Sequence, residues 1–199
     1  MVFRDYKQCK NIYWKYVPHE TLEDYFDGIK IVQQQGYKIK AVVCDGKRGL
    51  LQSFGNIPVQ MCQFHQVAIV TRYITKRSKI KAHRALLEVV YLMVKTDKES
   101  FVGALNDWHQ QWKEYMNEQV FDEQTKKYRY SHHRLRSAYR SLITNLPFLF
   151  TWYDYYDLRI PNTTNSLEGA FTDLKNKIRV HAGLKKQRKQ KLIDALLSR

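Results

Sequence analysis

A continuous helical pattern interrupts an alternation of short strands and helices, and this interruption limits the folds open to the chain. Up to residue 78, short apolar runs alternate with amphipathic helical segments, which favours an α/β or α+β sheet core. From about residue 79 to 150 the apolar spacing is helical throughout. We therefore predict a core in two parts, 1–78 and 151–199, with an all-helical insertion over 79–150 between them.

The residue pattern also predicts where the elements begin and end. Thr21 should open a helix and Gly36 should stop it, because threonine caps helix N-termini and glycine adopts the left-handed conformation that ends them. A capping box at 96–99 predicts a helix start within the insertion, and 119–130 is expected to be a polar loop. Expected strands are 2–3, 12–17, 39–44 and 59–62, and further expected helices are 47–54, 63–74, 82–95, 131–146, 163–180 and 185–197.

Basic residues strongly outnumber acidic ones in this chain of 199 residues. It has 34 Lys and Arg against 19 Asp and Glu, a formal net charge of +15 and a pI near 9.7. Such an excess favours a polyanion as partner, and aromatic residues interleaved with the basic ones favour nucleic acid. A solvated helix face is the alternative for any single basic residue. The residues predicted to contact DNA are Arg134, Arg136, Lys175, Lys185 and Arg188.

The cysteines and the hydropathy of the chain predict its surroundings. Cys9, Cys44 and Cys62 form no even set for a disulfide framework, which predicts a reducing, cytoplasmic setting. The sequence contains no apolar run of about 18 residues, so we expect no membrane-spanning segment and no membrane partner. The first residues also lack the apolar core of a signal peptide.

Two acidic residues at the ends of regular elements are the candidate catalytic groups. Asp45 ends an apolar strand, and the following Gly46 allows a sharp turn and close approach of a ligand. Glu168 lies in the first turns of a late helix. Asp45 could instead be a turn residue, and Glu168 could simply favour the helix dipole. As a pair, they suit a Mg²⁺ site for phosphoryl transfer, in which carboxylates, waters and phosphate oxygens surround the ion.

Cys62 and His65 have the spacing of metal ligands, but a structural zinc site needs four. Cys9 and Cys44 could in principle complete such a set, yet we do not expect structural zinc. The structural interpretation is a buried cysteine next to a hydrogen-bonded histidine. The functional interpretation is a histidine that contacts DNA or stabilises the site. Asp5, the other acid near an early strand, is expected in a turn.

Two segments carry a combination of motifs that is typical of one enzyme family. Residues 59–66 read Val-Gln-Met-Cys-Gln-Phe-His-Gln, and residues 160–168 read Ile-Pro-Asn-Thr-Thr-Asn-Ser-Leu-Glu. With the Asp-Gly pair after a strand, the helical block and residues 134–139, they resemble the DDE transposases of bacterial insertion sequences. The mutator-like group with a Cys-x-x-His signature is the most similar, and the resemblance covers essentially the whole chain.

This resemblance implies an RNase H-like fold with a helical insertion before the last acidic residue. It implies cleavage of the DNA ends of a mobile element by water, and then attack of the freed 3′-hydroxyl on target DNA, with Mg²⁺ or Mn²⁺. Asp45 matches the second Asp of the family and Glu168 its Glu, while Cys62 and His65 match its Cys-x-x-His pair. It also implies double-stranded DNA as partner, a homo-oligomer in the active complex and a bacterial, nucleoid-associated location.

The first catalytic Asp of the family lies on a strand that precedes the one matched by Val2 and Phe3. We therefore expect an N-terminally truncated catalytic domain that lacks this strand and is inactive or weakly active, because one metal carboxylate is missing. Two alternatives stay open. One is a non-catalytic DNA-binding remnant that inhibits an intact transposase, and the other is an RNase H-like nuclease that uses Asp5 as its third acid.

Overall fold

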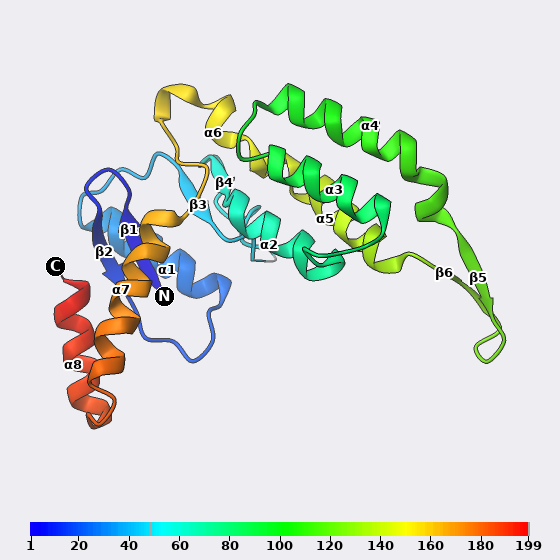
Figure 1. Ribbon diagram of the computed structural model, residues 1–199. Coiled ribbons are helices and arrows are strands. Elements are labelled where there is room, and N and C mark those ends of the chain that lie inside the picture. The colour runs from blue at the N-terminus through cyan, green and yellow to red at the C-terminus, as the bar shows by residue number, and fades with distance from the viewer. Residues whose placement is uncertain (48, 199) are drawn as a thin grey trace. The chain divides into compact units, whose positions relative to one another are not determined.

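The computed structural model describes residues 1–47 and 49–198, and its architecture is mixed α/β (Figure 1). The chain divides into two compact units, which are described one at a time. Unit 1 contains Met1–Lys40 and Thr164–Arg199, and unit 2 contains Ala41–Thr163. The described strands form two-stranded sheets, with β1–β2 in unit 1 and both β3–β4 and β5–β6 in unit 2.

Unit 1 is built on an antiparallel hairpin of β1 (Val2–Asp5) and β2 (Lys10–Trp14). Its helices are α1 (Leu22–Gln34), α7 (Asn165–Val180) and α8 (Lys186–Leu197). The hairpin, α1 and both final helices confirm the elements predicted from the sequence. The turn after β1 is also as expected, since the Asp5 carboxylate accepts hydrogen bonds from the amides of Lys7 and Gln8 at 2.8 and 3.0 Å.

Helix α1 can pack closely on the hairpin because it has a glycine at the contact. A Cβ atom on Gly28 would lie only 2.7 Å from Cζ of Phe3, so a larger residue would push the helix away. Helix α8 is tied to the other strand, because the Asp194 carboxylate accepts from Trp14 Nε1 at 2.9 Å and from the Tyr16 hydroxyl at 3.0 Å. Burial and this hydrogen bond raise the pKa of Tyr16 to about 12, so its hydroxyl remains a donor.

Unit 2 joins a parallel strand pair to a helical block (Figure 1). The strands are β3 (Val42–Cys44) and β4 (Val59–Met61), with Val43 opposite Gln60. The helices are α2 (Gln63–Ile74), α3 (Lys81–Leu92), α4 (Lys98–Asn117), α5 (His133–Leu149), the short α6 (Thr151–Asp154) and the 3-10 turn η1 (Tyr156–Leu158). Large apolar side chains fill the block; among the fully buried ones are Leu86, Phe101, Leu105, Leu135, Leu142 and Phe150.

One part of the predicted insertion is wrong, because 119–130 is not a loop in an all-helical block. It forms an antiparallel hairpin of β5 (Gln119–Asp122) and β6 (Lys127–Tyr130). Its strand residues include valine and several aromatics, which favour extended backbone. The Asp122 carboxylate closes the turn by accepting from the amides of Gln124 and Thr125 at 3.0 and 3.1 Å. The polar turn residues dominate the composition and conceal the short strands on either side.

Other predicted boundaries also differ from the structure. Residues 49–56 form turns rather than the helix expected over 47–54, since Gly49 and Gly55 adopt positive φ angles of 81° and 58°. Asp97, not Thr96, caps α4 by accepting from the Ser100 amide at 2.7 Å. Helix α5 continues through Pro147 instead of ending before it. The position of Arg48 lies outside the described residues.

The predicted boundaries at 78 and 150 separate a core from an inserted segment, whereas the two units of the structure separate compact parts of the chain. The division into core and insertion therefore stays a prediction. None of the helices in the described part of the chain has the length and apolar character required to cross a lipid bilayer.

Replacing Thr21 with alanine should lower the free energy of unfolding by about 1 kcal/mol, as for other helix caps. The Thr21 hydroxyl accepts from the Asp24 amide at 3.1 Å, and the Asp24 carboxylate accepts from the Thr21 amide at 3.1 Å. Urea unfolding at neutral pH measures this loss. Thr172→Ala, at an exposed position inside α7, is the control and should change stability less.

The same cap should make stability depend on pH. Hydrogen bonds from Lys15 and Thr21 lower the pKa of Asp24 to about 2. A carboxylate with a lowered pKa stabilises the folded state above its unfolded pKa of about 3.9, and this contribution disappears as the pH falls towards 2. The difference between wild type and Asp24→Asn should therefore shrink between about pH 4 and pH 2.

Candidate functional site

The carboxyl ends of β3 and β4 lie side by side in unit 2 and bring Asp45 and Cys62 to equivalent positions. The strands are parallel, with Cys44 opposite Met61. The Cys62 amide donates to the Cys44 carbonyl oxygen at 2.7 Å, so the pairing continues to the next residue. Proteins with parallel strands commonly bind ligands at this edge. The structure therefore places the predicted Asp and the predicted Cys at one edge of the strand pair.

Asp45 is exposed and its position is set by a tight turn. Its Oδ1 atom accepts from the Lys47 amide at 3.1 Å, so the turn role considered from the sequence is present. Gly46 adopts a φ angle of 81°, and a Cβ atom there would lie 2.8 Å from Sδ of Met61. Only glycine satisfies both conditions without strain. The turn that carries the exposed carboxylate therefore has little conformational freedom.

Cys62 and His65 lie on the same side of the first turn of α2. Cys62 is fully buried at the N-cap position, and His65 is half-buried. The Cys62 sulfur and a His65 ring nitrogen lie within 4.8 Å of one another, as expected for residues three apart on a helix. The two side chains therefore act as one local pair rather than as independent groups.

The thiol of Cys44 lies in the interior of the strand pair. Burial raises its pKa to about 11, and the charges of Asp45 and Cys62 act in the same direction. The thiol is therefore protonated at neutral pH in the metal-free chain. Cys9 belongs to unit 1, where it is exposed. The four-ligand zinc set that was considered from the sequence stays an untested alternative.

Gln63 joins the Cys-x-x-His motif to the segment 160–163, although 99 residues separate the two partners. The Gln63 amide donates to the Asn162 carbonyl oxygen at 3.0 Å, and Asn162 Nδ2 donates to Gln63 Oε1 at 3.1 Å. Gln63 is fully buried, so neither bond competes with bulk water. The two motifs that carry the family resemblance are therefore directly bonded within unit 2.

Two further buried glutamines, which the sequence analysis did not single out, complete this network. Gln60 Nε2 donates to the Leu149 carbonyl oxygen at 2.9 Å, and Gln60 Oε1 accepts from the Trp152 amide at 2.9 Å. Gln66 bonds to Ser141 and Asn145 on α5 at 3.1 and 2.7 Å. The sequence does show these three glutamines at every third position, 60, 63 and 66, and this regular spacing could have drawn attention to them. Polar residues at positions that would otherwise be buried indicate a hydrogen-bonded interior.

Glu168 lies in unit 1, on the first turns of α7. It is exposed, and the Thr164 hydroxyl donates to its Oε1 atom at 2.7 Å. Arg4 on β1 holds this end of the helix, since its Nε atom donates to Ser166 Oγ at 3.0 Å. The helix begins at Asn165, two residues later than the start at 163 expected from the sequence. Because Asp45 belongs to unit 2, the two carboxylates remain a predicted pair.

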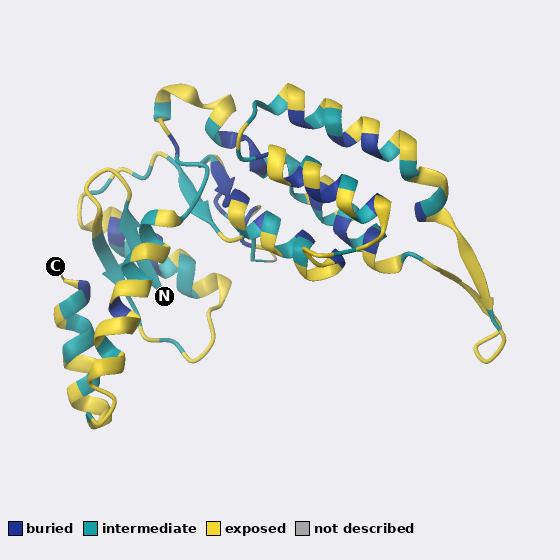
Figure 2. Cartoon of the chain, viewed as in Figure 1, coloured by how far each residue is buried: buried dark blue, intermediate teal, exposed yellow. Residues whose placement is uncertain are grey.

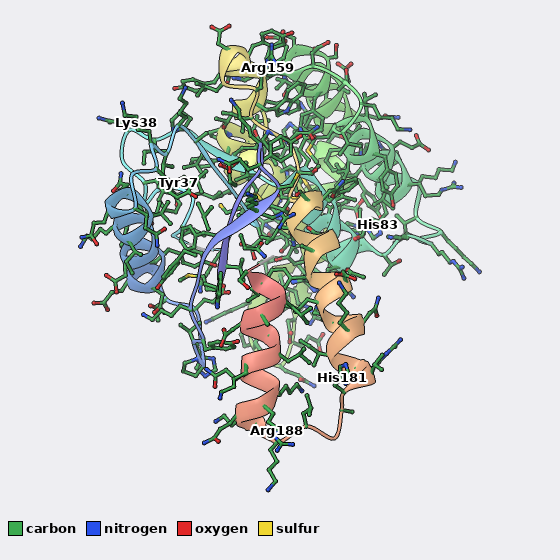
Figure 3. The ribbon with its side chains drawn as sticks, turned by 90° about the vertical axis from the view of Figure 1, so that its left-hand side faces the viewer. Tyr37, Lys38, His83, Arg159, His181 and Arg188 are labelled. Atoms are coloured by element: carbon green, nitrogen blue, oxygen red, sulfur yellow. The ribbon has the colours of Figure 1, made fainter. Side chains whose placement is uncertain are left out.

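The basic candidates fall into two groups. Arg134 and Arg136 make internal contacts in unit 2: Arg134 Nη2 donates to the Arg72 carbonyl oxygen at 2.9 Å, and the Arg136 guanidinium lies 3.6 Å from the centre of the Tyr130 ring. Lys175, Lys185 and Arg188 are exposed in unit 1. Figure 3 shows Arg188 extending outward from the end of the α7–α8 pair, near the turn between these helices. Arg134 is exposed as well, so it shares with the second group the solvent access that phosphate contact requires.

Comparisons with protein-family models, curated proteins and solved structures found no match. Inferences about function therefore depend on the motifs and on the geometry described above.

Gly46→Ala should destabilise the protein more than Gly36→Ala, which is the matched control. Both glycines have positive φ angles, of 81° and 89°, but a Cβ atom on Gly36 would meet no heavy atom within 4 Å. Gly36→Ala should cost about 1–2 kcal/mol from backbone strain alone. Gly46→Ala should cost about 1–3 kcal/mol more, because it crowds Met61. Urea unfolding compares them, and equal losses would contradict the contact with Met61.

Gln63→Met should weaken the attachment of the segment 160–163 and lower the free energy of unfolding by about 1–3 kcal/mol. Methionine has a similar volume but no amide group. Asn162 Nδ2 therefore loses its acceptor Gln63 Oε1, and the Leu149 carbonyl oxygen loses the donor Gln63 Nε2. Hydrogen exchange of the backbone amides in 162–165 should become faster. Gln111→Met, at an exposed position of α4, is the control and should leave the exchange of this segment unchanged.

Proposed function

We propose that this chain is a catalytic domain of the DDE transposase type with an RNase H-like core, a class of enzyme that cleaves and joins DNA with Mg²⁺ or Mn²⁺. The observation that carries this proposal is the direct bonding of Gln63 to Asn162. The two residues belong to the segments 59–66 and 160–168, which resemble family motifs, and they are partners in the folded chain although they lie far apart in the sequence. The parallel pair β3–β4 with α2 after it also fits part of such a core.

The proposed ion is a hard divalent cation held by carboxylates. Mg²⁺ prefers oxygen ligands and is usually held by one or two carboxylates together with waters and phosphate oxygens. Asp45 and Glu168 would hold it, and both carboxylates are exposed. The ion would supply positive charge that stabilises the attacking and leaving oxygens of an in-line displacement. Cys62 is buried, which suits a packing role beside His65.

The remaining residues bind and orient the substrate in this proposal. His65 and the Asp45 turn lie at one edge of the strand pair, where a DNA phosphate could be positioned. Lys175, Lys185 and Arg188 contact phosphates and supply affinity that does not depend on sequence. The proposed partners are double-stranded element ends and target DNA, bound by a homo-oligomer, and the proposed location is the bacterial nucleoid.

A second candidate function is a non-catalytic DNA-binding protein that inhibits an intact transposase. The observation that favours it is that Lys175, Lys185 and Arg188 are exposed on helices α7 and α8 and need no metal to bind DNA. Under this hypothesis duplex binding weakens steeply with salt, and no metal produces cleavage.

Nicking of supercoiled plasmid by the 199-residue chain tests the catalytic proposal. Mg²⁺ or Mn²⁺ should support weak nicking, as expected for a site with two carboxylates, and Asp45→Asn or Glu168→Gln should each reduce its rate by about 100-fold or more, because each removes a charge that holds the metal. Asp173→Asn is the control: it lies on the same helix as Glu168, and its carboxylate bonds to Lys177 at 2.6 Å. This variant should nick the plasmid at the rate of the wild type.

Undiminished nicking in either carboxylate variant would refute the assignment of the site. Salt-sensitive duplex binding without nicking in either metal would overturn the catalytic proposal for this chain and establish the second candidate instead.

A further inference from the structure

The β5–β6 hairpin presents one aromatic face and one mixed face. Figure 1 shows it extending beyond the ends of the neighbouring helices of unit 2, α4 and α5. Phe121 pairs with Tyr128 and Gln119 with Tyr130, so these four side chains share a face, since partners across an antiparallel pair point the same way. Val120, Asp122, Lys127 and Arg129 lie on the other face.

The aromatic face is open to solvent. Tyr128 is 70% exposed, Phe121 45% and Tyr130 39%. Figure 2 shows most of the hairpin in the colour of exposed residues. Phe121 and Tyr128 contact one another edge to face, with ring centres 5.2 Å apart, but they cover little of each other. Exposed aromatic surface of this kind costs free energy in water and is typical of a binding surface.

The base of the hairpin is held firmly. Glu118, just before β5, accepts from the Ser131 amide at 2.9 Å and lies 2.9 Å from Nε2 of His132, both just after β6. The His132 ring stacks on Tyr115 of α4 with the ring centres 3.8 Å apart. The Arg136 guanidinium covers one side of the Tyr130 ring. The aromatic face is therefore presented in a fixed direction, and less conformational entropy is lost when a ligand binds.

The charges on and near the hairpin indicate what kind of ligand binds. Lys126, Lys127 and Arg129 lie on the turn and β6. The Asp122 carboxylate is engaged in the turn and lies 3.7 Å from the Arg129 guanidinium. The whole chain has a net charge of +15, so a second copy would be repelled, while a polyanion would be attracted. Aromatic rings beside lysines are the arrangement that binds single-stranded nucleic acid, where bases stack and phosphates meet positive charge.

We propose that the β5–β6 hairpin is a nucleic-acid arm, in which Tyr128 and Phe121 stack on unpaired bases of DNA while Lys126 and Lys127 contact the adjoining phosphates. The proposal shares DNA binding with the proposed function but does not require catalysis.

Binding of a fluorescein-labelled 20-mer of thymidylate, measured by anisotropy with the full chain, tests this. Tyr128→Leu keeps an apolar strand residue but removes the ring, and it should weaken binding about tenfold. Tyr128→Phe keeps the ring and should bind like wild type, which separates stacking from hairpin folding. Tyr156→Leu, another highly exposed tyrosine of unit 2, is the matched control and should have no effect. Lys127→Gln should lower the slope of log Kd against log salt by about 0.7.

The affinities of wild type, Tyr128→Leu and Tyr128→Phe for a blunt 20-base-pair duplex should differ little, because the bases of a duplex are not available for stacking. Wild-type affinity of Tyr128→Leu for the thymidylate 20-mer would overturn the proposal. So would a change in sedimentation from dimer to monomer without a change in affinity, which would make the face an interface between copies. Binding is measured in EDTA, where no divalent ion can support nicking, so failure of the arm and failure of the catalytic site are separately visible.

Discussion

Three buried glutamine side chains hold β4 and α2 against the end of α5, and the geometry of the candidate site depends on them. Gln60 and Gln63 both donate to the Leu149 carbonyl oxygen, at 2.9 and 3.0 Å. A buried amide that loses its partner carries the full cost of desolvation, so such a network tolerates few alternative arrangements. It fixes the start of α2, and hence Cys62 and His65, relative to the segment that contains Asn162. A purely apolar contact would permit more sliding.

Much of the secondary structure could be predicted because its signals are local. The helix start at Thr21 and the apolar spacing of α2 and α3 depend on neighbouring residues, and the structure confirms these elements. Predicted helix ends were wrong where contacts with residues distant in the sequence overrode the local residue preferences. Pro147 predicted a helix end, but α5 continues to Leu149. The Leu149 carbonyl oxygen accepts hydrogen bonds from Gln60 of β4 and Gln63 of α2, which hold this last turn in place. The β5–β6 hairpin was missed because its strands are short and its turn is polar.

The candidate site could be predicted only in part, for the same reason. The position of Asp45 at a strand end and the pairing of Cys62 with His65 follow from sequence spacing, and unit 2 has both. Nothing in the spacing could show that Arg134 and Arg136 contact other elements of the unit, because their partners, Arg72 and Tyr130, lie on α2 and β6. The three glutamines at every third position were visible in the sequence, but their burial was not, since a single sequence does not distinguish an interior amide from an exposed one.

The hydrogen bonds to Leu149 have a consequence for the length of α5. The last carbonyl groups of a helix have no partners within it, and here the glutamine amides serve one of them from 86 and 89 residues away. The C-terminal end of α5 is therefore fixed by hydrogen bonds from other elements rather than by a helix-terminating residue in its own sequence. One residue added to α5 would turn its end by about 100° and carry the Leu149 carbonyl away from both amides. Substitutions on the solvent side of α5 are compatible with this fold, whereas a change in the number of its residues is not.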